Sequence, residues 1–391
     1  MYTSTLIADL EKRMSFVLEG KNWLWKITIV AILLFVLIDF GGNISKLVYF
    51  RTLVNDFIKQ GTLDTTHSII KAQSEDYFAF FKKGRDIDIA SYEHEAKMKF
   101  RLFLPTLVRI IGAKHFDIWL YVLGVVVGFF YIHLVAKMTL RILGAETNRL
   151  VILIFVVGFT NLYAGGGSFV LDIIPYGDFF AYLFLLMSIY YRNPVGVFLC
   201  CQCAFWVDER ALVNAAYVIV WWSFIDLNES VGIRFKITTQ AITVVLSGIL
   251  YMGIRRYLTA YHHLLDSIYT GEFISTFYEN MKMISLRVWA GFEGFWLLVL
   301  LCLWILIKEK KYQFLVMMLG TIAISVGFAL IAFDANRGIS YGFIVLFMSL
   351  VICKKYLSES ELKYLLLVCC MVALLSPTLS KYRIVGGTQL M

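Results

Sequence analysis

The chain has 391 residues, of which 60% are hydrophobic and only 16% are charged. Apolar stretches of roughly 15 to 25 residues recur along most of its length, which predicts an all-α polytopic membrane protein. No polar segment is large enough for a nucleotide-binding domain, which argues against an ATP-driven mechanism or a nucleotide-sugar substrate. The net charge of +8 requires no nucleic-acid partner, since basic cytoplasmic loops and anionic lipid head groups account for it.

Residues 1–22 precede the first apolar span. Between Leu6 and Leu18, apolar residues recur at helical spacing and are interrupted by charged ones, which predicts a helix lying on the inner membrane surface. No small-residue cleavage site follows the first apolar run. We therefore expect a retained anchor and a single transmembrane domain over residues 23–391.

About eleven spans are expected in that domain. The fourth, fifth and sixth are shorter than the roughly 20 residues that usually cross a bilayer. The predicted spans cover residues 23–39, 116–140, 150–163, 177–191, 194–206, 211–225, 237–254, 288–307, 314–333, 339–353 and 362–375.

Basic residues in the short loops predict the orientation of the spans. They all fall on one side of the membrane, which we assign as cytoplasmic together with the N-terminus. The other connections then face outward, among them long loops over residues 40–115 and 255–287. The basic residues used are Lys137, Arg141, Arg149, Arg192, Arg234, Lys236, Lys308, Lys310, Lys311, Lys354 and Lys355.

The seven cysteines lie within or at the ends of the apolar spans, where we expect small core residues. They have neither the spacing of a metal site nor a place in the outer loops that would suit disulfides. No metal ligands are predicted among them.

Two segments of the first outer loop, residues 44–58 and 93–111, have the pattern of amphipathic surface helices. In the second segment, His94 and Arg101 are seven residues apart and so share roughly one helix face. The acidic neighbours of His94 have oxygens that could hold a divalent cation, although no further ligand at a fixed spacing supports one. No other cofactor is expected.

Carboxylates stand at the outer ends of several spans, where burying a charge costs at least a few kcal/mol. Asp39 ends the first span, either as a base that reaches an outer cavity or as a helix end that meets water. Asp172 and Asp178 flank Pro175 before the fourth span. One of them could cap that helix or belong to a functional site.

Two outer turns combine acidic and basic residues. Asp208, Glu209 and Arg210 lie between two short apolar spans, either in an internal polar pocket or as a mutually neutralised structural group. Asp334 and Arg337 repeat the pattern between the ninth and tenth spans. An Arg at such a depth suits a bidentate contact with phosphate.

This order of features resembles the GT-C superfamily of integral-membrane glycosyltransferases. That family has an acidic residue after the first span, a long first outer loop with surface helices, an Asp before a middle span, and an acidic and basic pair at a later outer turn. Here these places are taken by Asp39, residues 40–115, Asp172 or Asp178, and the turn from Asp208 to Arg210. The resemblance covers residues 1–225, and the rest of the chain only in topology.

The resemblance implies inverting transfer of a sugar from a polyprenyl-phosphate donor to a glycan or glycolipid acceptor, on the outer side of the bacterial cytoplasmic (inner) membrane. It implies a carboxylate base, for which Asp39 is the first choice. The predicted catalytic residues are Asp39, Asp172, Asp208 and Glu209. The residues predicted to bind the donor phosphate or sugar are His94, Arg101, Asp178, Arg210, Asp334 and Arg337.

Three other classes of membrane protein share parts of this pattern. A polymerase of O-antigen or exopolysaccharide also combines many spans, large outer loops and essential arginines, but it would make ladders of product. A flippase or transporter of lipid-linked sugars would place ionisable groups near mid-membrane and show inverted repeats, whereas the charges here gather at one surface. The third class is a non-catalytic scaffold with structural ion pairs.

Overall fold

The computed structural model describes residues 12–14, 16–41, 70, 74, 100–111, 116–168, 177–227, 232–261, 270–331 and 335–376. The secondary structure of these residues is helical apart from β1 (Ile225–Asp226) and β2 (Gly232–Ile233), which form a short antiparallel pair. Five of the described helical segments are long and apolar enough to cross a membrane. The chain is therefore an α-helical, multi-pass membrane protein, as predicted.

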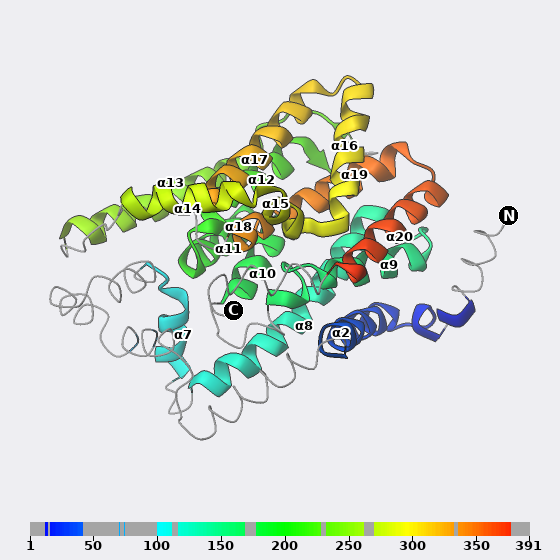
Figure 1. The fold of residues 1–391 in the computed structure, drawn as a ribbon, viewed down its shortest axis with the longest axis horizontal. Helices are drawn as coiled ribbons and strands as arrows, with labels where there is room; N and C mark the ends of the chain where they lie inside the picture. The colour runs from blue at the N-terminus through cyan, green and yellow to red at the C-terminus, as the bar shows by residue number, and fades with distance from the viewer. Residues whose placement is uncertain are drawn as a thin grey trace.

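Figure 1 shows how the helices are arranged. Their bounds are α2 (Trp23–Gly41), α7 (Phe103–Ile111), α8 (Phe116–Leu143), α9 (Arg149–Asn161), η2 (Gly166–Ser168), α10 (Asp178–Tyr190), α11 (Pro194–Val207), α12 (Arg210–Phe224), α13 (Thr239–Tyr261), α14 (Thr270–Lys282), α15 (Ile284–Phe292), η3 (Glu293–Phe295), α16 (Trp296–Lys308), α17 (Tyr312–Ile331), α18 (Ala335–Ser340), α19 (Ile344–Tyr356) and α20 (Glu359–Leu375).

Every predicted span falls on a helical segment of the structure. The segments with the length and hydropathy of a membrane span are Val122–Leu143, Arg149–Ser168, Thr239–Ala260, Ile284–Lys308 and Tyr312–Ile331. The three spans predicted to be short are α10, α11 and α12, with 13, 14 and 15 residues. The total of about eleven spans and the GT-C fold stay predictions.

The helix predicted over residues 93–111 is wrong at Arg101. α7 begins at Phe103, and the two residues before it are not helical. The physical reason is Pro105, whose ring would clash with the carbonyl group of Arg101, four residues earlier, in a continuous helix. Arg101 therefore lies outside the helix, on the segment that leads into α7.

The predicted second outer loop, residues 255–287, is largely helical where the structure describes it. α13 continues to Tyr261, and α14 and the start of α15 cover most of the remainder. The guanidinium group of Arg255 lies over the ring of Phe100, 4.4 Å from its centroid. This contact joins the end of α13 to the segment that carries Arg101.

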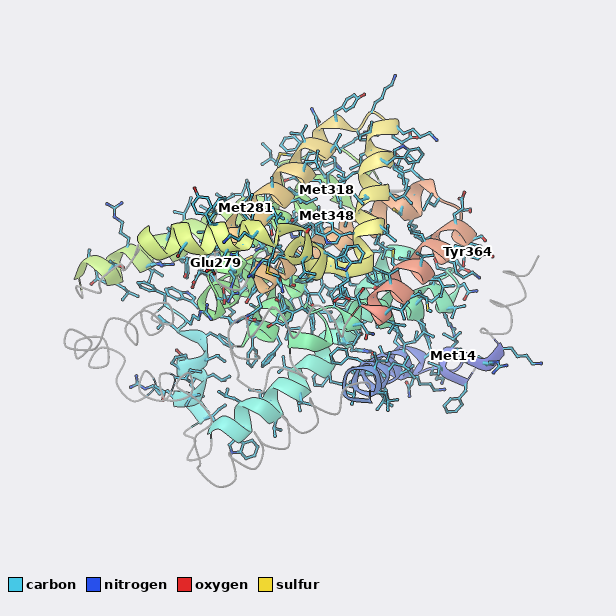
Figure 2. All side chains as sticks on the ribbon, in the orientation of Figure 1. Met14, Glu279, Met281, Met318, Met348 and Tyr364 are labelled. Carbon is cyan, nitrogen blue, oxygen red and sulfur yellow. The ribbon has the colours of Figure 1, made fainter. Side chains whose placement is uncertain are left out.

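The centre of the bundle is formed by α9 and α19. Residues 150–161 and 344–353 are buried, and they pack against α2, α8, α16 and α20. The ring centroids of Phe159 and Phe347 are 5.7 Å apart, which joins the two central helices. In Figure 2, Met318 and Met348 lie among the interior side chains, whereas Met281 on α14 is exposed. A helix that is apolar all round is expected in such a central position.

The outer helices expose apolar side chains. Leu246 and Ile249 of α13, and Val316 and Ile324 of α17, are among the exposed large hydrophobic residues. Exposed apolar surface on helices long enough to span a bilayer is suited to contact with lipid.

The buried cysteines agree with their prediction as core residues, and the N-terminal segment is described only in part. All seven cysteines are free, and six of them are buried. Residues 12–14 and 16–18 are helical, within the segment predicted to form a surface helix. The position of that helix on the membrane stays a prediction.

Candidate functional site

Three short helices bring charged residues to one end of the bundle. α10 begins at Asp178, α11 ends just before Asp208, and α12 begins at Arg210. Because helices joined by tight turns run antiparallel, the start of α10, the end of α11 and the start of α12 lie at the same end. The other ends of these helices lie near residues 191–193 and 225.

The turn from Asp208 to Arg210 is closed by the Asp208 side chain. Its Oδ1 accepts hydrogen bonds from the backbone N and the Nε of Arg210, both at 2.9 Å, and its Oδ2 accepts one from Nη2 at 2.8 Å. The carboxylate is fully buried. Two parallel bonds between a guanidinium and a carboxylate are both strong and directional.

Arg101 reaches the same carboxylate from the segment before α7. Its Nη2 lies 3.0 Å from Oδ2 of Asp208 and 3.9 Å from Oε1 of Glu209. The Arg101 side chain is 10% exposed and that of Glu209 is 29% exposed. Among the described residues, the buried Nε of Arg101 has no hydrogen-bond acceptor.

A second ion pair joins α10 to α18. Nε of Arg337 donates to Oδ2 of Asp178 at 2.7 Å, and Nη2 donates to Oδ1 at 2.9 Å. The hydroxyl of Tyr341 donates to Oδ1 at 3.0 Å, and that of Tyr163 to Oδ2 at 3.3 Å. Asp178 is fully buried, and both of its oxygens are occupied.

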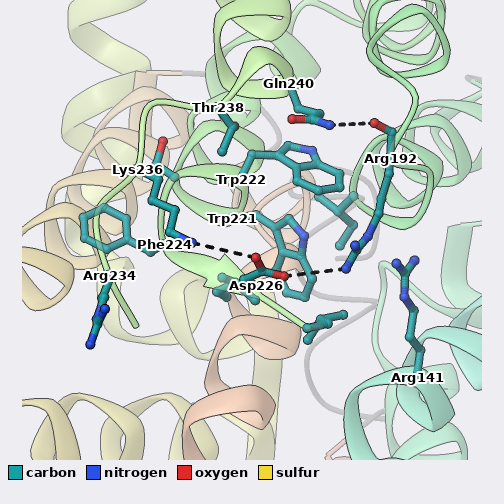
Figure 3. Close-up of a pocket in the computed structure, with 14 residues that line it drawn as sticks. Arg141, Arg192, Trp221, Trp222, Phe224, Asp226, Arg234, Lys236, Thr238 and Gln240 are labelled. Atoms are coloured by element: carbon teal, nitrogen blue, oxygen red, sulfur yellow. Dashed lines mark hydrogen bonds and ion pairs between the residues drawn. The ribbon is translucent and has the colours of Figure 1, made fainter. Parts of the chain in front are cut away.

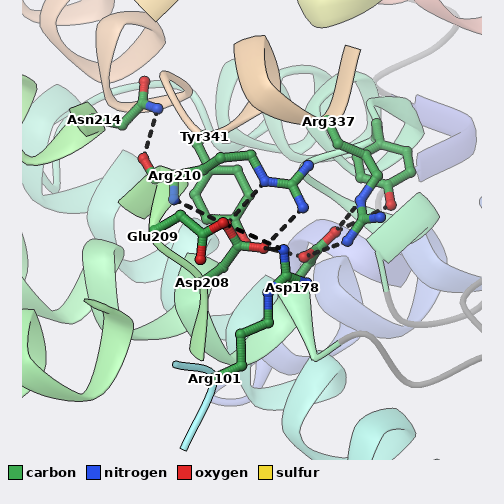
Figure 4. A network of polar contacts seen from close by, with 9 residues as sticks. Arg101, Asp178, Asp208, Glu209, Arg210, Asn214, Arg337 and Tyr341 are labelled. Atoms are coloured by element: carbon green, nitrogen blue, oxygen red, sulfur yellow. Dashed lines mark hydrogen bonds and ion pairs between the residues drawn. The ribbon is translucent and has the colours of Figure 1, made fainter. Parts of the chain in front are cut away.

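Tyr341 links the two ion pairs into one network, which Figure 4 shows. Its hydroxyl binds Asp178, and the guanidinium carbon of Arg210 lies 5.6 Å from the centroid of its ring. Behind the network, Nδ2 of Asn214 donates to the carbonyl of Arg210, and Ser325 of α17 donates to Oδ1 of Asn214. The start of α12 is thus held by α17 as well.

Among the described residues of this network, buried arginines outnumber buried carboxylates. Arg101, Arg210 and Arg337 are at most 8% exposed, and the fully buried carboxylates beside them are Asp178 and Asp208. Asp208 contacts the guanidinium groups of both Arg101 and Arg210, and Asp178 contacts that of Arg337. Among the described residues, three guanidinium groups therefore meet two fully buried carboxylates and the partly exposed Glu209.

Six of the ten residues predicted for the site come together here: Arg101, Asp178, Asp208, Glu209, Arg210 and Arg337. For Asp39, the backbone lies in α2 but the side chain is outside the described part. His94, Asp172 and Asp334 lie outside the described residues. The roles predicted for all ten stay predictions.

Sequence reasoning missed Tyr163, Tyr341 and Asn214. Tyr341 follows Arg337 by four residues, and Asn214 follows Arg210 by four, which is one helical turn in each case. A search for polar residues one turn after the predicted arginines would have found these two. Tyr163 had the weaker signal of standing at the end of a predicted span.

No metal centre is formed within the described part of the chain. No group of three or more His, Cys, Asp or Glu side chains is placed there to hold an ion. The divalent cation considered near His94 concerns residues outside this part and stays a prediction.

Comparison with protein-family models, with curated protein sequences and with solved structures finds no match to this chain. What the fold and the site define is an α-helical, multi-pass membrane protein with a buried cluster of arginines and carboxylates at one end of its short helices.

Proposed function

We propose that the protein is a membrane glycosyltransferase of the GT-C type, which moves a sugar from a polyprenyl-phosphate donor to a glycan or glycolipid acceptor. The observation that carries this proposal is the buried excess of guanidinium groups, with an Nε of Arg101 that has no acceptor among the described residues. A phosphate leaving group gains negative charge as the sugar departs. Fixed guanidinium groups in a site shielded from water stabilise that charge strongly.

The lengths of the helices support access from the lipid. At 1.5 Å per residue, α10, α11 and α12 are about 20 to 22 Å long, whereas the apolar part of a bilayer is about 30 Å thick. If their opposite ends lie at one membrane surface, the site lies about 10 Å below the other surface. A polyprenyl chain in the bilayer could bring its phosphate to that depth by moving sideways between helices.

The carboxylates of the cluster differ in their hydrogen bonds, and this difference indicates different roles. Asp178 and Asp208 each bind guanidinium groups through both oxygens, which suits them to positioning arginines more than to accepting a proton. Glu209 is the more exposed carboxylate of the cluster. We assign it as the general base within the described residues, and Asp39 stays the alternative predicted from the sequence.

The reaction then runs as a single displacement. The base takes the proton of the acceptor hydroxyl, whose oxygen forms a bond to the anomeric carbon from the face opposite the phosphate. The bond between the anomeric carbon and the phosphate oxygen breaks with both electrons leaving on that oxygen. The polyprenyl phosphate departs with its charge beside Arg101, Arg210 and Arg337, and the sugar is inverted.

The distribution of basic residues supports a site on the extracytoplasmic side, and the proposed GT-C activity makes the membrane a bacterial cytoplasmic one. Arg192 follows α10 and Arg234 and Lys236 follow the hairpin after α12, at the ends of these helices far from Asp178 and Arg210. Basic residues mark the cytoplasmic ends of spans. The site then faces the other side, with the N-terminus in the cytoplasm.

A polysaccharide polymerase is the second candidate, because an arginine cluster also suits two lipid-linked polymer substrates. Both candidates are tested by one experiment. The purified protein in lipid vesicles is offered a panel of polyprenyl-phosphate sugars and lipid-linked oligosaccharides, and products are sized. Addition of a single sugar supports the transferase, and ladders support the polymerase. Movement of the donor across the vesicle membrane without any product would overturn both.

A further inference from the structure

A second cluster of charged residues lies at the opposite ends of α10 and α12. It lines a cavity of about 160 Å³, shown in Figure 3. Arg141 comes from the end of α8, Arg192 from the turn between α10 and α11, and Arg234 and Lys236 from the segment after the hairpin. Asp226 is the acidic residue among those that line the cavity. The lining therefore carries four basic residues and one acidic residue, and Arg192 and Lys236 form ion pairs with Asp226.

The ion pairs in this cavity are weak compared with those of the arginine cluster. Arg192 and Lys236 lie 3.7 Å and 4.0 Å from the oxygens of Asp226, and all three side chains are 36% to 48% exposed. In the arginine cluster the shortest contact of this kind is 2.7 Å. Long ion pairs near the surface contribute little, so these basic groups lose little by turning toward another anion.

Hydrogen bonds hold the guanidinium of Arg141 and the backbone of Arg192 in place. Nη1 of Arg141 donates to the carbonyl of Tyr190, and Nε2 of Gln240 donates to the carbonyl of Arg192 at 2.6 Å. Trp222 lines the cavity, with its Nε1 bonded to the carbonyl of Ser188. A positioned guanidinium offers a planar fork of donors that matches a phosphate group.

The size of the cavity limits what can enter. Sites for drug-sized ligands usually have about 300 to 1,000 Å³, so a cavity near 160 Å³ suits a single small anionic group better than a nucleotide. Basic pockets between membrane helices on the cytoplasmic side are suited to anionic lipid head groups. The predicted topology puts this cavity on that side.

We propose that this cavity binds a phosphate group, either the head group of an anionic phospholipid or a soluble phosphate. The proposal is independent of the proposed transferase activity. The cavity and the arginine cluster lie at opposite ends of α12, which is about 22 Å long. Loss of either site would therefore leave the chemistry of the other in place.

The test measures thermal unfolding of the purified full-length protein in neutral detergent. Dioctanoyl-phosphatidylglycerol, dioctanoyl-phosphatidylcholine and inorganic phosphate are each titrated against it. A ligand that binds the folded state raises the unfolding temperature, and the rise grows with the logarithm of the ratio of ligand concentration to Kd. Stabilisation by phosphatidylglycerol alone identifies a lipid head group, and stabilisation by inorganic phosphate identifies a soluble ligand.

Two sets of matched variants test whether the anion binds in this cavity. R192Q/R234Q/K236Q removes three charges from the cavity, and K308Q/K311Q/K355Q removes three exposed charges that the topology puts on the same side. At about 1 kcal/mol for each charge, the first variant should weaken binding on the order of a hundredfold and the second by little. R234Q alone, which keeps the other contacts, should weaken it about fivefold.

The proposal is overturned if neither anion stabilises the protein more than phosphatidylcholine does. It is also overturned if the two triple variants, or Arg234→Gln and Lys311→Gln, weaken binding equally. In that case the attraction comes from the general charge of the surface.

Discussion

Arg337 donates two hydrogen bonds to Asp178, although 159 residues separate them in the chain. The pair joins α18 to the start of α10, and both partners are buried. Tyr341, one turn further along, binds the same carboxylate. The arginine cluster is therefore assembled from distant parts of the chain, and its geometry depends on the packing of α18.

Breaking this pair should be costly for folding. Asp178→Asn keeps the shape of the side chain but leaves the guanidinium of Arg337 without a counter-charge, and Arg337→Gln does the reverse. Each should lower the free energy of unfolding by about 3 to 5 kcal/mol. The double variant should cost less than the sum of the two by about 1 to 3 kcal/mol.

Unfolding in mixed micelles measures all three variants. The matched control is Asp226→Asn, whose partly exposed carboxylate has ion pairs of 3.7 and 4.0 Å and should cost less than about 1 kcal/mol. Additive costs for Asp178→Asn and Arg337→Gln would show that the two side chains do not interact in the folded protein.

Gly338 should not tolerate a side chain. A Cβ there would lie 2.7 Å from the Cβ and 3.1 Å from the Cα of Ala329 on α17, so Gly338→Ala must shift α18 and with it Arg337. We expect a loss of about 1 to 3 kcal/mol in the free energy of unfolding.

Gly327, also on α17, gives the comparison, because a Cβ there meets no atom of the described residues within 4 Å. Gly327→Ala should be neutral or stabilising by up to about 1 kcal/mol, since Ala favours the helix. Equal effects of the two substitutions, measured by thermal unfolding, would mean that α18 does not pack on α17 at Gly338.

Glu209→Gln tests the assignment of the base. The substitution keeps the size of the side chain and removes its ability to accept a proton. The rate of sugar transfer should fall on the order of 10² to 10⁴, with the donor still bound. Glu279→Gln on α14, an exposed carboxylate, should leave the rate unchanged. If Glu209→Gln is fully active and Asp39→Asn is not, the base is Asp39.

Much of the helical framework could be predicted, because apolar runs of this length have few alternatives in a bilayer. Alternation of the spans also predicts that Asp178, Asp208 and Arg337 lie at the same end of the bundle. The first prediction uses the length of each apolar run. The second uses the alternating direction in which consecutive spans cross the membrane.

The pairing of the charges could not be predicted in the same way. Arg337 binds Asp178, which lies 159 residues away on another helix, and the sequence pattern did not indicate this pair. The sequence also allowed Asp178 to act as a helix cap. In the structure its carboxylate accepts hydrogen bonds from Arg337, Tyr341 and Tyr163. Side-chain pairing between helices depends on the relative rotation and depth of the helices, which hydropathy does not report.

The start of α20 should respond to acid. Ser358 and Glu361 form a capping box, and hydrogen bonds from the hydroxyl and the backbone of Ser358 lower the pKa of Glu361 from its ordinary 4.5. A lowered pKa in the folded state gives stability that is present above the ordinary value and is lost as the pH falls through the folded value.

Glu361→Gln should therefore have a lower unfolding temperature than the wild type at neutral pH, and the difference should shrink as the pH falls below 4.5. Thermal unfolding across this range measures it. Glu359→Gln, in the same first turn, controls for the loss of a charge near the helix start. A difference that is constant with pH would contradict the contribution of the ionised Glu361.

Arg101→Gln gives the most direct measurement of the central claim, that the buried arginines bind the phosphate of the donor. Asp208 keeps its bonds from Arg210 in this variant, so the fold should hold. The rate of sugar transfer from a polyprenyl-phosphate donor should fall on the order of 10² to 10³, while Arg109→Gln, an exposed change on α7, retains the wild-type rate. Transfer by Arg101→Gln at the wild-type rate would contradict the account.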